Sequence, residues 1–167
     1  MKTVILGGTG LLESSIYHNL ISNKYNCLTT SKNKKSNLKT NHLSKNIILK
    51  FLKKNQPKLV INCVAETNVD LCNKDFIHAY KSNVLTVRNF VTCLNELKLN
   101  CFFVHISTDQ VYDSKKASNE KHVNISNNYA HTKFLSEYEA IKYKKTLILR
   151  TNFYGQSKSI NRKSFSD

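Results

Sequence analysis

A cluster of glycines near the N-terminus constrains the fold of this chain more than any other feature. Three of the four glycines lie within residues 7–10, directly after the apolar, β-branched run 2–6. The next segment, residues 11–22, has apolar side chains at helical spacing. Glycine permits positive φ and lets a phosphate approach the backbone N–H groups of a helix N-terminus. This strand–turn–helix arrangement predicts a dinucleotide-binding turn, although a tight turn without a ligand would also use a glycine or two.

Apolar strands alternate with amphipathic helices along the rest of the chain. We expect strands at 26–30, 58–64, 101–107 and 146–150, and helices at 43–54, 75–98 and 129–144. Residues 31–42 and 109–128 have the composition of loops, and residues 155–167 show no periodic pattern. Such alternation requires helical crossovers between parallel strands. The expected fold is therefore α/β, a Rossmann-like doubly wound parallel sheet with three αβα layers.

Composition narrows the classes of function. The net charge of +15 comes from 26 basic residues, of which only Arg88, Arg150 and Arg162 are arginine. Nucleic-acid sites favour the bidentate fork of arginine, so we interpret the lysines as solvated surface and nucleic-acid binding as the minor alternative. No apolar run is long enough for a membrane span, and the first residues do not resemble a signal peptide. The five cysteines contain no CxxC pair, which is typical of reduced thiols in a cytoplasmic protein.

Two positions near the glycine turn depart from the usual dinucleotide-binding pattern. The spacing GxxGxxG normally places a third glycine where this chain has Glu13, and a carboxylate there would repel a diphosphate. The second strand is followed by Ser31 and Lys32 instead of the acidic residue that binds the ribose hydroxyls of NAD. Hydroxyl and ammonium groups suit a 2′-phosphate, so NADP(H) is favoured over NAD(H). The alternative is that these lysines belong to the general lysine excess.

A tyrosine four residues before a lysine is the acid pair of short-chain dehydrogenases, but the pattern is not selective in this chain. It occurs at Tyr112–Lys116, Tyr129–Lys133, Tyr138–Lys142 and Tyr154–Lys158. Of the four tyrosines, Tyr129 alone opens an expected helix that follows a strand ending in hydroxyl side chains. We therefore predict Tyr129 as the proton donor to a carbonyl oxygen and Lys133 as the cation beside it. Thr108 would hydrogen-bond the same substrate oxygen.

Six motifs occur in the order and spacing of a known family. They are GGTG (7–10), INCVAETNVD (61–70), Asn83, ISTDQVYD (106–113), YAHTK (129–133) and LRTNFYG (149–155). Together they resemble the extended short-chain dehydrogenases/reductases and are most similar to the dTDP-4-dehydrorhamnose reductase family. The resemblance implies an NADP(H)-dependent reduction of a 4-keto nucleotide-sugar to the 4-hydroxyl. Two alternatives stay open: an NAD-dependent sugar epimerase or dehydratase, and a non-catalytic NAD(P)-binding regulatory subunit.

The same resemblance implies a role for individual residues. Thr108, Tyr129 and Lys133 form the implied catalytic trio, and Thr108, Asp109 and Phe153 are implied at the substrate. The residues implied or expected at the cofactor are Gly7, Gly10, Leu11, Leu12, Ser31, Lys32, Cys63, Val64, Ala65, Asn83, Tyr129 and Lys133. No metal site is predicted.

The length of the chain bears on its domain organisation. Members of the resembled family continue well beyond this length into a smaller domain that closes over the nucleotide-sugar. We therefore expect residues 1–155 to form an NAD(P)-binding Rossmann-like domain and residues 156–167 to begin a truncated substrate-binding region. On this interpretation the chain is a fragment that lacks most of the substrate pocket and its lid. The sequence leaves open whether the fragment is active and whether it forms a homodimer.

Overall fold

Six parallel strands form one sheet in the order β3-β2-β1-β4-β5-β6. The computed structural model describes residues 1–7, 11–31, 38–39, 42–114 and 117–153. The strands are β1 (Lys2–Leu6), β2 (Asn26–Ser31), β3 (Leu38–Lys39), β4 (Leu59–Asn62), β5 (Phe102–Thr108) and β6 (Thr146–Thr151). The direction of strand succession reverses between β1 and β4, which creates the switch point where doubly wound sheets bind ligands. The expected Rossmann-like sheet is confirmed.

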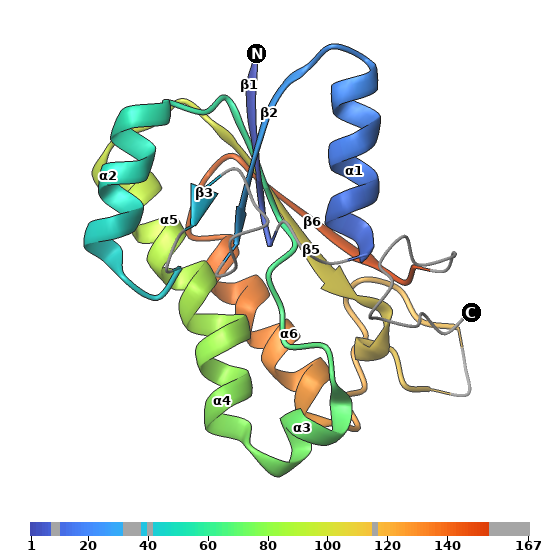
Figure 1. Ribbon diagram of the computed structural model, residues 1–167. Coiled ribbons are helices and arrows are strands. Elements are labelled where there is room, and N and C mark those ends of the chain that lie inside the picture. The colour runs from blue at the N-terminus through green and yellow to red at the C-terminus, as the bar shows by residue number, and fades with distance from the viewer. Residues whose placement is uncertain (8–10, 32–37, 40–41, 115–116, 154–167) are drawn as a thin grey trace.

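Helices cover both faces of the sheet, as Figure 1 shows. They are α1 (Leu11–Ser22), α2 (Lys45–Asn55), α3 (Val69–Lys74), α4 (Phe76–Tyr80), α5 (Thr86–Glu96) and α6 (Asn128–Ala140), with a π-helical turn η1 (Lys81–Leu85) and a 3₁₀ turn η2 (Asp109–Val111). Helix α1 lies on one face, whereas α2, α5 and α6 lie side by side on the other. The three αβα layers are therefore present.

The hydrophobic core lies between the sheet and the layer of α2, α5 and α6. Val4 and Leu6 of β1 are fully buried, in agreement with the apolar run that predicted this strand. Helix α5 buries Val87, Phe90 and Leu94, which recur at the helical spacing seen in the sequence. Burial of this stripe holds α5 against the sheet. Helix α6 packs beside α5 and against β5, so its position depends on the same core.

Strand β4 ends at Asn62, two residues earlier than the sequence predicted. The Asn62 side-chain oxygen accepts a hydrogen bond from the Val64 N–H at 3.2 Å, which takes that N–H away from the strand ladder. Residues 63–68, called the crevice loop below, then lead to α3, whose N-cap Asn68 accepts from Leu71 N at 2.9 Å. Helix α3 was not predicted, because six residues are too few to show a periodic pattern.

The long helix expected at 75–98 is divided into α4, η1 and α5. The π-helical turn inserts an extra residue and turns Asn83 into the protein, where its side chain is fully buried. Helix α6 ends at Ala140 instead of residue 144. The two-residue strand β3 occurs within the expected loop 31–42. The predicted start of a second domain at 156–167 lies outside the described residues.

Two expectations from composition can be compared with the structure. All five cysteines are free thiols, and four of them are buried. Within the described ranges, none of the helices combines the length and the apolar character that crossing a membrane requires.

Two adjacent phenylalanines on β5 test the position of the core. Phe103 is 0% exposed and Phe102 is 60% exposed. We expect Phe103→Ala to lower the free energy of unfolding by about 3–5 kcal/mol because it leaves a cavity. Phe102→Ala should cost less than about 1 kcal/mol, since that ring is largely solvated. Urea denaturation of both variants measures the difference, and equal losses would contradict this face of β5 being the core face.

Candidate active site at the carboxyl ends of the strands

The backbone after β1 approaches the crevice loop so closely that a side chain would not fit between them. Gly7 has a φ of +108°, and its N–H donates to Thr30 O at 2.9 Å. A Cβ atom on Gly7 would lie 2.6 Å from Glu13 Oε1 and 3.2 Å from Val64 N. Residue 7 therefore needs glycine both for its backbone conformation and for space. Gly7 and the crevice loop therefore lie side by side at the switch point of the sheet.

Some of the predicted cofactor residues can be placed at this end of the sheet. Cys63, Val64 and Ala65 occupy the crevice loop and are half-buried, and Leu12 is half-buried in the first turn of α1. Leu11 begins α1 and Ser31 ends β2. Gly10 and Lys32 lie outside the described residues.

Glu13 is a buried carboxylate in the first turn of α1, with 7% of its surface exposed. Its Oε1 atom packs against Gly7. Burial raises the pKa of the Cys63 thiol, the charge of Glu13 raises it further, and the charge of Lys133 lowers it. The charges of Glu13 on α1 and Lys133 on α6 thus both act on the Cys63 thiol of the crevice loop. The expected repulsion between Glu13 and a diphosphate stays a prediction.

Lys133 is buried on α6, with 2% of its surface exposed. Its Nζ donates a hydrogen bond to the carbonyl oxygen of Ile106 on β5 at 2.6 Å. Burial lowers its pKa to about 8, while Cys63 and Glu137 oppose that shift. The amine is therefore mostly charged at pH 7 and loses its charge within the range of ordinary assays.

Tyr129 lies one helical turn before Lys133 and is half-buried, and the Thr108 hydroxyl at the end of β5 is among the groups that shift the pKa of its phenol. Burial raises the pKa of the Tyr129 phenol, the Thr108 hydroxyl lowers it, and the charge of Asp109 raises it. The net shift is upward, so the phenol keeps its proton at neutral pH. Helix α6 begins here because Asn127 caps it, accepting from Ala130 N at 2.8 Å. The structure thus brings the predicted trio to one end of the sheet.

Asn83 connects the crevice loop to α6. Its Oδ1 accepts from Glu66 N at 2.7 Å, and its Nδ2 donates to Glu66 O at 3.2 Å. The same Nδ2 donates to Thr132 Oγ1 at 2.9 Å, and that hydroxyl donates to Tyr129 O at 2.9 Å. The Asn83 side chain is thus bonded to the protein on both sides. In this structure it orients the loop and the first turn of α6.

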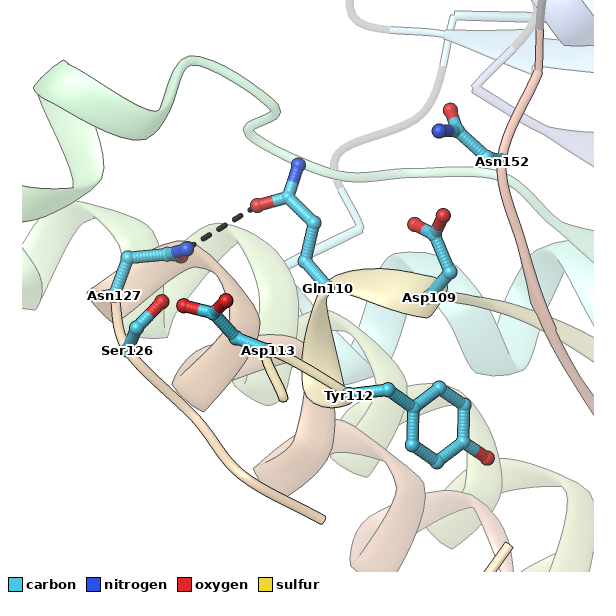
Figure 2. Close-up of a pocket in the computed structure, with 7 residues that line it drawn as sticks. All are labelled: Asp109, Gln110, Tyr112, Asp113, Ser126, Asn127 and Asn152. Carbon is cyan, nitrogen blue, oxygen red and sulfur yellow. Dashed lines mark hydrogen bonds between the residues drawn. The ribbon is translucent and has the colours of Figure 1, made fainter. Parts of the chain in front are cut away.

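A polar pocket of about 300 Å³ lies where η2 follows β5, with Asp109, the residue after Thr108, in its wall (Figure 2). Its lining residues are Asp109, Gln110, Tyr112, Asp113, Ser126, Asn127 and Asn152. Asp109 and Asn152 lie on one side of it, and Asn127 on the other donates to Gln110 Oε1 at 3.2 Å. Carboxylate and amide groups arranged in this way suit a ligand rich in hydroxyl groups.

Phe153, the other residue implied at the substrate, does not line this pocket. It is 41% exposed and lines a larger cavity of about 660 Å³, together with Ile16 and Leu149. Tyr112 lines both cavities. The structure therefore places Asp109 and Phe153 in neighbouring cavities, and only Asp109 lies next to Thr108.

A buried ion pair under the site was not predicted from the sequence. The Glu137 carboxylate accepts from Arg150 Nη2 at 2.7 Å and Nε at 3.0 Å, and from Ser107 Oγ at 2.5 Å. Arg150 also donates to the hydroxyl of Tyr112 at 2.7 Å. The bonds to Glu137 raise the pKa of the guanidinium, so it stays charged. Glu137 lies one turn after Lys133, which makes this pair part of the electrostatic surroundings of the site.

The polar residues on strands β4, β5 and β6 are the sequence signal that could have revealed this network. Ser107 pairs with Arg150 across β5 and β6, and Asn62 pairs with His105 across β4 and β5. Each is a polar side chain on the core face of an otherwise apolar strand. Buried polar groups need partners, so their presence predicts a network. Its members on α6 cannot be read from the strands.

Comparison with known proteins identifies relatives of the whole chain. A family model described as the RmlD substrate binding domain matches residues 1–165. A solved dTDP-4-dehydrorhamnose reductase from Clostridium acetobutylicum is 27% identical with a TM-score of 0.82, covering 96% of this chain and 56% of that one. The same enzyme from Bacillus anthracis, solved in complex with NADP, is 24% identical with a TM-score of 0.80, covering 94% and 57%.

A third relative comes from a different class of protein. The methionine adenosyltransferase 2 subunit beta of Danio rerio is 25% identical over 146 residues, which cover 85% of this chain and 44% of that protein. The chain thus spans about half the length of each of these three proteins.

The Glu137–Arg150 pair gives a prediction about stability. We expect Arg150→Leu to lower the free energy of unfolding by about 3–5 kcal/mol, because it leaves a buried carboxylate without its cation. The double variant Glu137→Leu/Arg150→Leu should recover most of that loss, since neither charge is then buried. Chemical denaturation of the wild type, both single variants and the double variant measures the coupling. Additive losses in the double variant would show that the two side chains do not interact.

Proposed function

The chain belongs to the RmlD substrate binding domain family, and on that basis we propose that it is the cofactor-binding part of an NADP(H)-dependent 4-keto nucleotide-sugar reductase. The observation that carries the proposal is the placement of Thr108 at the end of β5, next to the part of α6 that carries Tyr129 and Lys133, with the Lys133 ammonium bonded to the carbonyl oxygen of Ile106. The dTDP-4-dehydrorhamnose reductase of Clostridium acetobutylicum supports the substrate class. A cytoplasmic location agrees with five free thiols.

The residues around Gly7 and the crevice loop fit a nicotinamide dinucleotide. Gly7 leaves the backbone free of a side chain where a diphosphate would approach, and α1 begins at the adjoining turn. Cys63, Val64 and Ala65 would line its other side. The buried Lys133 ammonium would hold the nicotinamide ribose. When bound, the cofactor supplies a hydride to the carbonyl carbon of the sugar.

The chain's own residues would supply the proton to the carbonyl oxygen and would orient the sugar. Tyr129 would donate its phenolic proton to the carbonyl oxygen, which becomes the 4-hydroxyl, and would regain a proton from solvent. Thr108 would donate a hydrogen bond to the same oxygen. Lys133, one turn away, would stabilise the phenolate left after proton transfer. The polar pocket of Asp109, Gln110 and Asn152 would bind sugar hydroxyls.

The preference for NADP(H) over NAD(H) rests on two findings. Ser31, the last residue of β2, and Lys32 stand where an acidic residue is usual in NAD-binding sites. The Bacillus anthracis reductase was solved with NADP. We therefore expect tighter binding of NADPH than of NADH.

A non-catalytic NADP(H)-binding subunit is the second candidate. The specific observation in its favour is the Glu13 carboxylate, which packs against Gly7 where the family usually has glycine. The subunit beta of Danio rerio shows that a relative of this chain carries the name of a subunit. The two candidates differ in whether NADPH is consumed or only bound.

Consumption of NADPH tests the proposed function. The chain is mixed with NADPH and a dTDP-4-keto-6-deoxyhexose, and loss of NADPH absorbance is followed. We expect turnover by the wild type and a kcat about 10²–10⁴ lower in Tyr129→Phe, which lacks the acidic proton. Tyr138→Phe, on the same helix with its ring 54% exposed, should match the wild type.

A fluorescence titration with NADPH accompanies this assay. Binding without turnover in the wild type would overturn the reductase proposal in favour of the non-catalytic subunit. Failure to bind at millimolar NADPH would overturn both.

Glu13 gives a second prediction, which concerns affinity. We expect Glu13→Gly to bind NADPH about tenfold more tightly, equivalent to about 1.4 kcal/mol, because a like charge near the diphosphate is removed. Glu13→Gln keeps the bulk without the charge, so its affinity should lie between the two. The gain should shrink at high salt. Equal Kd values for all three proteins would show that Glu13 does not face the diphosphate.

A further inference from the structure

A chain of buried hydrogen bonds runs from the crevice loop to α6 beneath the site. The Val64 N–H donates to Asn62 Oδ1 at 3.2 Å, and Asn62 Nδ2 lies 3.0 Å from His105 Nδ1. His105 Nε2 lies 2.8 Å from Ser136 Oγ, which donates to the carbonyl oxygen of Lys133 at 2.5 Å. Asn62, His105 and Ser136 are each at most 1% exposed. This series of hydrogen bonds joins β4, β5 and α6.

All the hydrogen bonds in this series have the same donor-to-acceptor direction, from the crevice loop toward α6. The bond from Val64 identifies the oxygen of the Asn62 amide, so the NH₂ group of Asn62 faces His105 and donates to Nδ1. Burial and the charge of Lys133 lower the pKa of His105 well below 6.5, so the ring is neutral. A neutral ring that accepts at Nδ1 carries its hydrogen on Nε2 and donates to Ser136. Every donor therefore faces α6.

We propose that Asn62, His105 and Ser136 are positioning residues that hold the crevice loop in register with the Tyr129–Lys133 turn of α6. The proposal rests on the proposed function, since that turn carries the proton donor and the loop lines the cofactor. Apolar packing holds a helix against a sheet but is non-directional. Hydrogen bonds fix distance and angle, and in a buried chain each one that is lost leaves a polar group unsatisfied.

The surroundings of His105 support a fixed ring orientation. Its imidazole stacks on Phe103 with a centroid distance of 6.3 Å and an interplanar angle of 5°. Phe103 and His105 both face the helix layer, since they alternate with Val104 along β5. Rotation of the ring would break the bonds to Asn62 and Ser136 together. The imidazole therefore links the position of β4, through Asn62, to the position of α6, through Ser136.

The tautomer of His105 is the first test, and it needs neither a variant nor a cofactor. In the protein labelled with ¹⁵N-histidine, NMR at neutral pH should show His105 neutral with its hydrogen on Nε2. An Nδ1–H tautomer or a charged ring would overturn the proposal, because Nδ1 could then no longer accept the hydrogen bond from Asn62.

The second test measures whether a change at Ser136 on α6 alters the environment of Val64 in the crevice loop. Ser136→Ala removes a hydroxyl that bonds to a carbonyl of α6. Thr146→Val is the matched control, since the Thr146 hydroxyl donates to Ala140 O at the far end of α6 at 2.8 Å. We expect Ser136→Ala to shift the backbone amide resonance of Val64, and Thr146→Val to leave it unchanged. An unshifted Val64 amide in Ser136→Ala would overturn the proposal.

Kinetics separate positioning from stability. We expect Ser136→Ala to lower kcat for NADPH oxidation at least tenfold, with a smaller change in KM for NADPH. Thr146→Val should lose a similar amount of stability in urea and keep kcat. Equal kcat in the two variants would overturn the positioning role. If the wild type itself consumes no NADPH, the proposed function fails, and the two NMR tests still decide whether this chain of hydrogen bonds exists.

Discussion

The close approach of two backbones at Gly7 is the constraint on which the rest of the site depends. Gly7 follows β1 and the crevice loop follows β4, and the two segments are adjacent because β1 and β4 pair as neighbouring parallel strands. A Cβ atom on residue 7 would lie 2.6 Å from Glu13 Oε1 and 3.2 Å from Val64 N, which is tighter than side chains normally pack. Glycine at residue 7 permits this approach of the two backbones. Helix α6 packs against β5, the strand next to β4.

Helix α6 packs against the sheet through polar as well as apolar side chains. Ser136 and Glu137 are buried toward β5, where they meet His105 and Ser107. In a medium of low dielectric such groups are costly unless every one is paired. Among the described residues, no buried side-chain nitrogen or oxygen lacks a partner. The network therefore favours a single placement of α6, which a purely apolar interface would fix less sharply.

Glu13 and Lys133 carry opposite charges, and both act on the Cys63 thiol of the crevice loop. The lysine suits an anionic or hydroxyl-bearing ligand, whereas the carboxylate opposes a diphosphate. Both are nearly inaccessible to solvent, so water screens them weakly.

The sequence by itself determined the order of most strands and helices, the need for glycine at residue 7, and the position of Tyr129 in the first turn of a helix. These follow from local patterns, because burial of one face repeats along a strand or helix and a turn needs particular backbone angles. It missed the end of β4 at Asn62, helix α3, the π-helical turn at Asn83, and the buried hydrogen bonds of His105 and Glu137. Those were decided by tertiary structure, since each depends on partners that are distant in sequence. A polar side chain has many potential partners, and only the packing of strands and helices selects one.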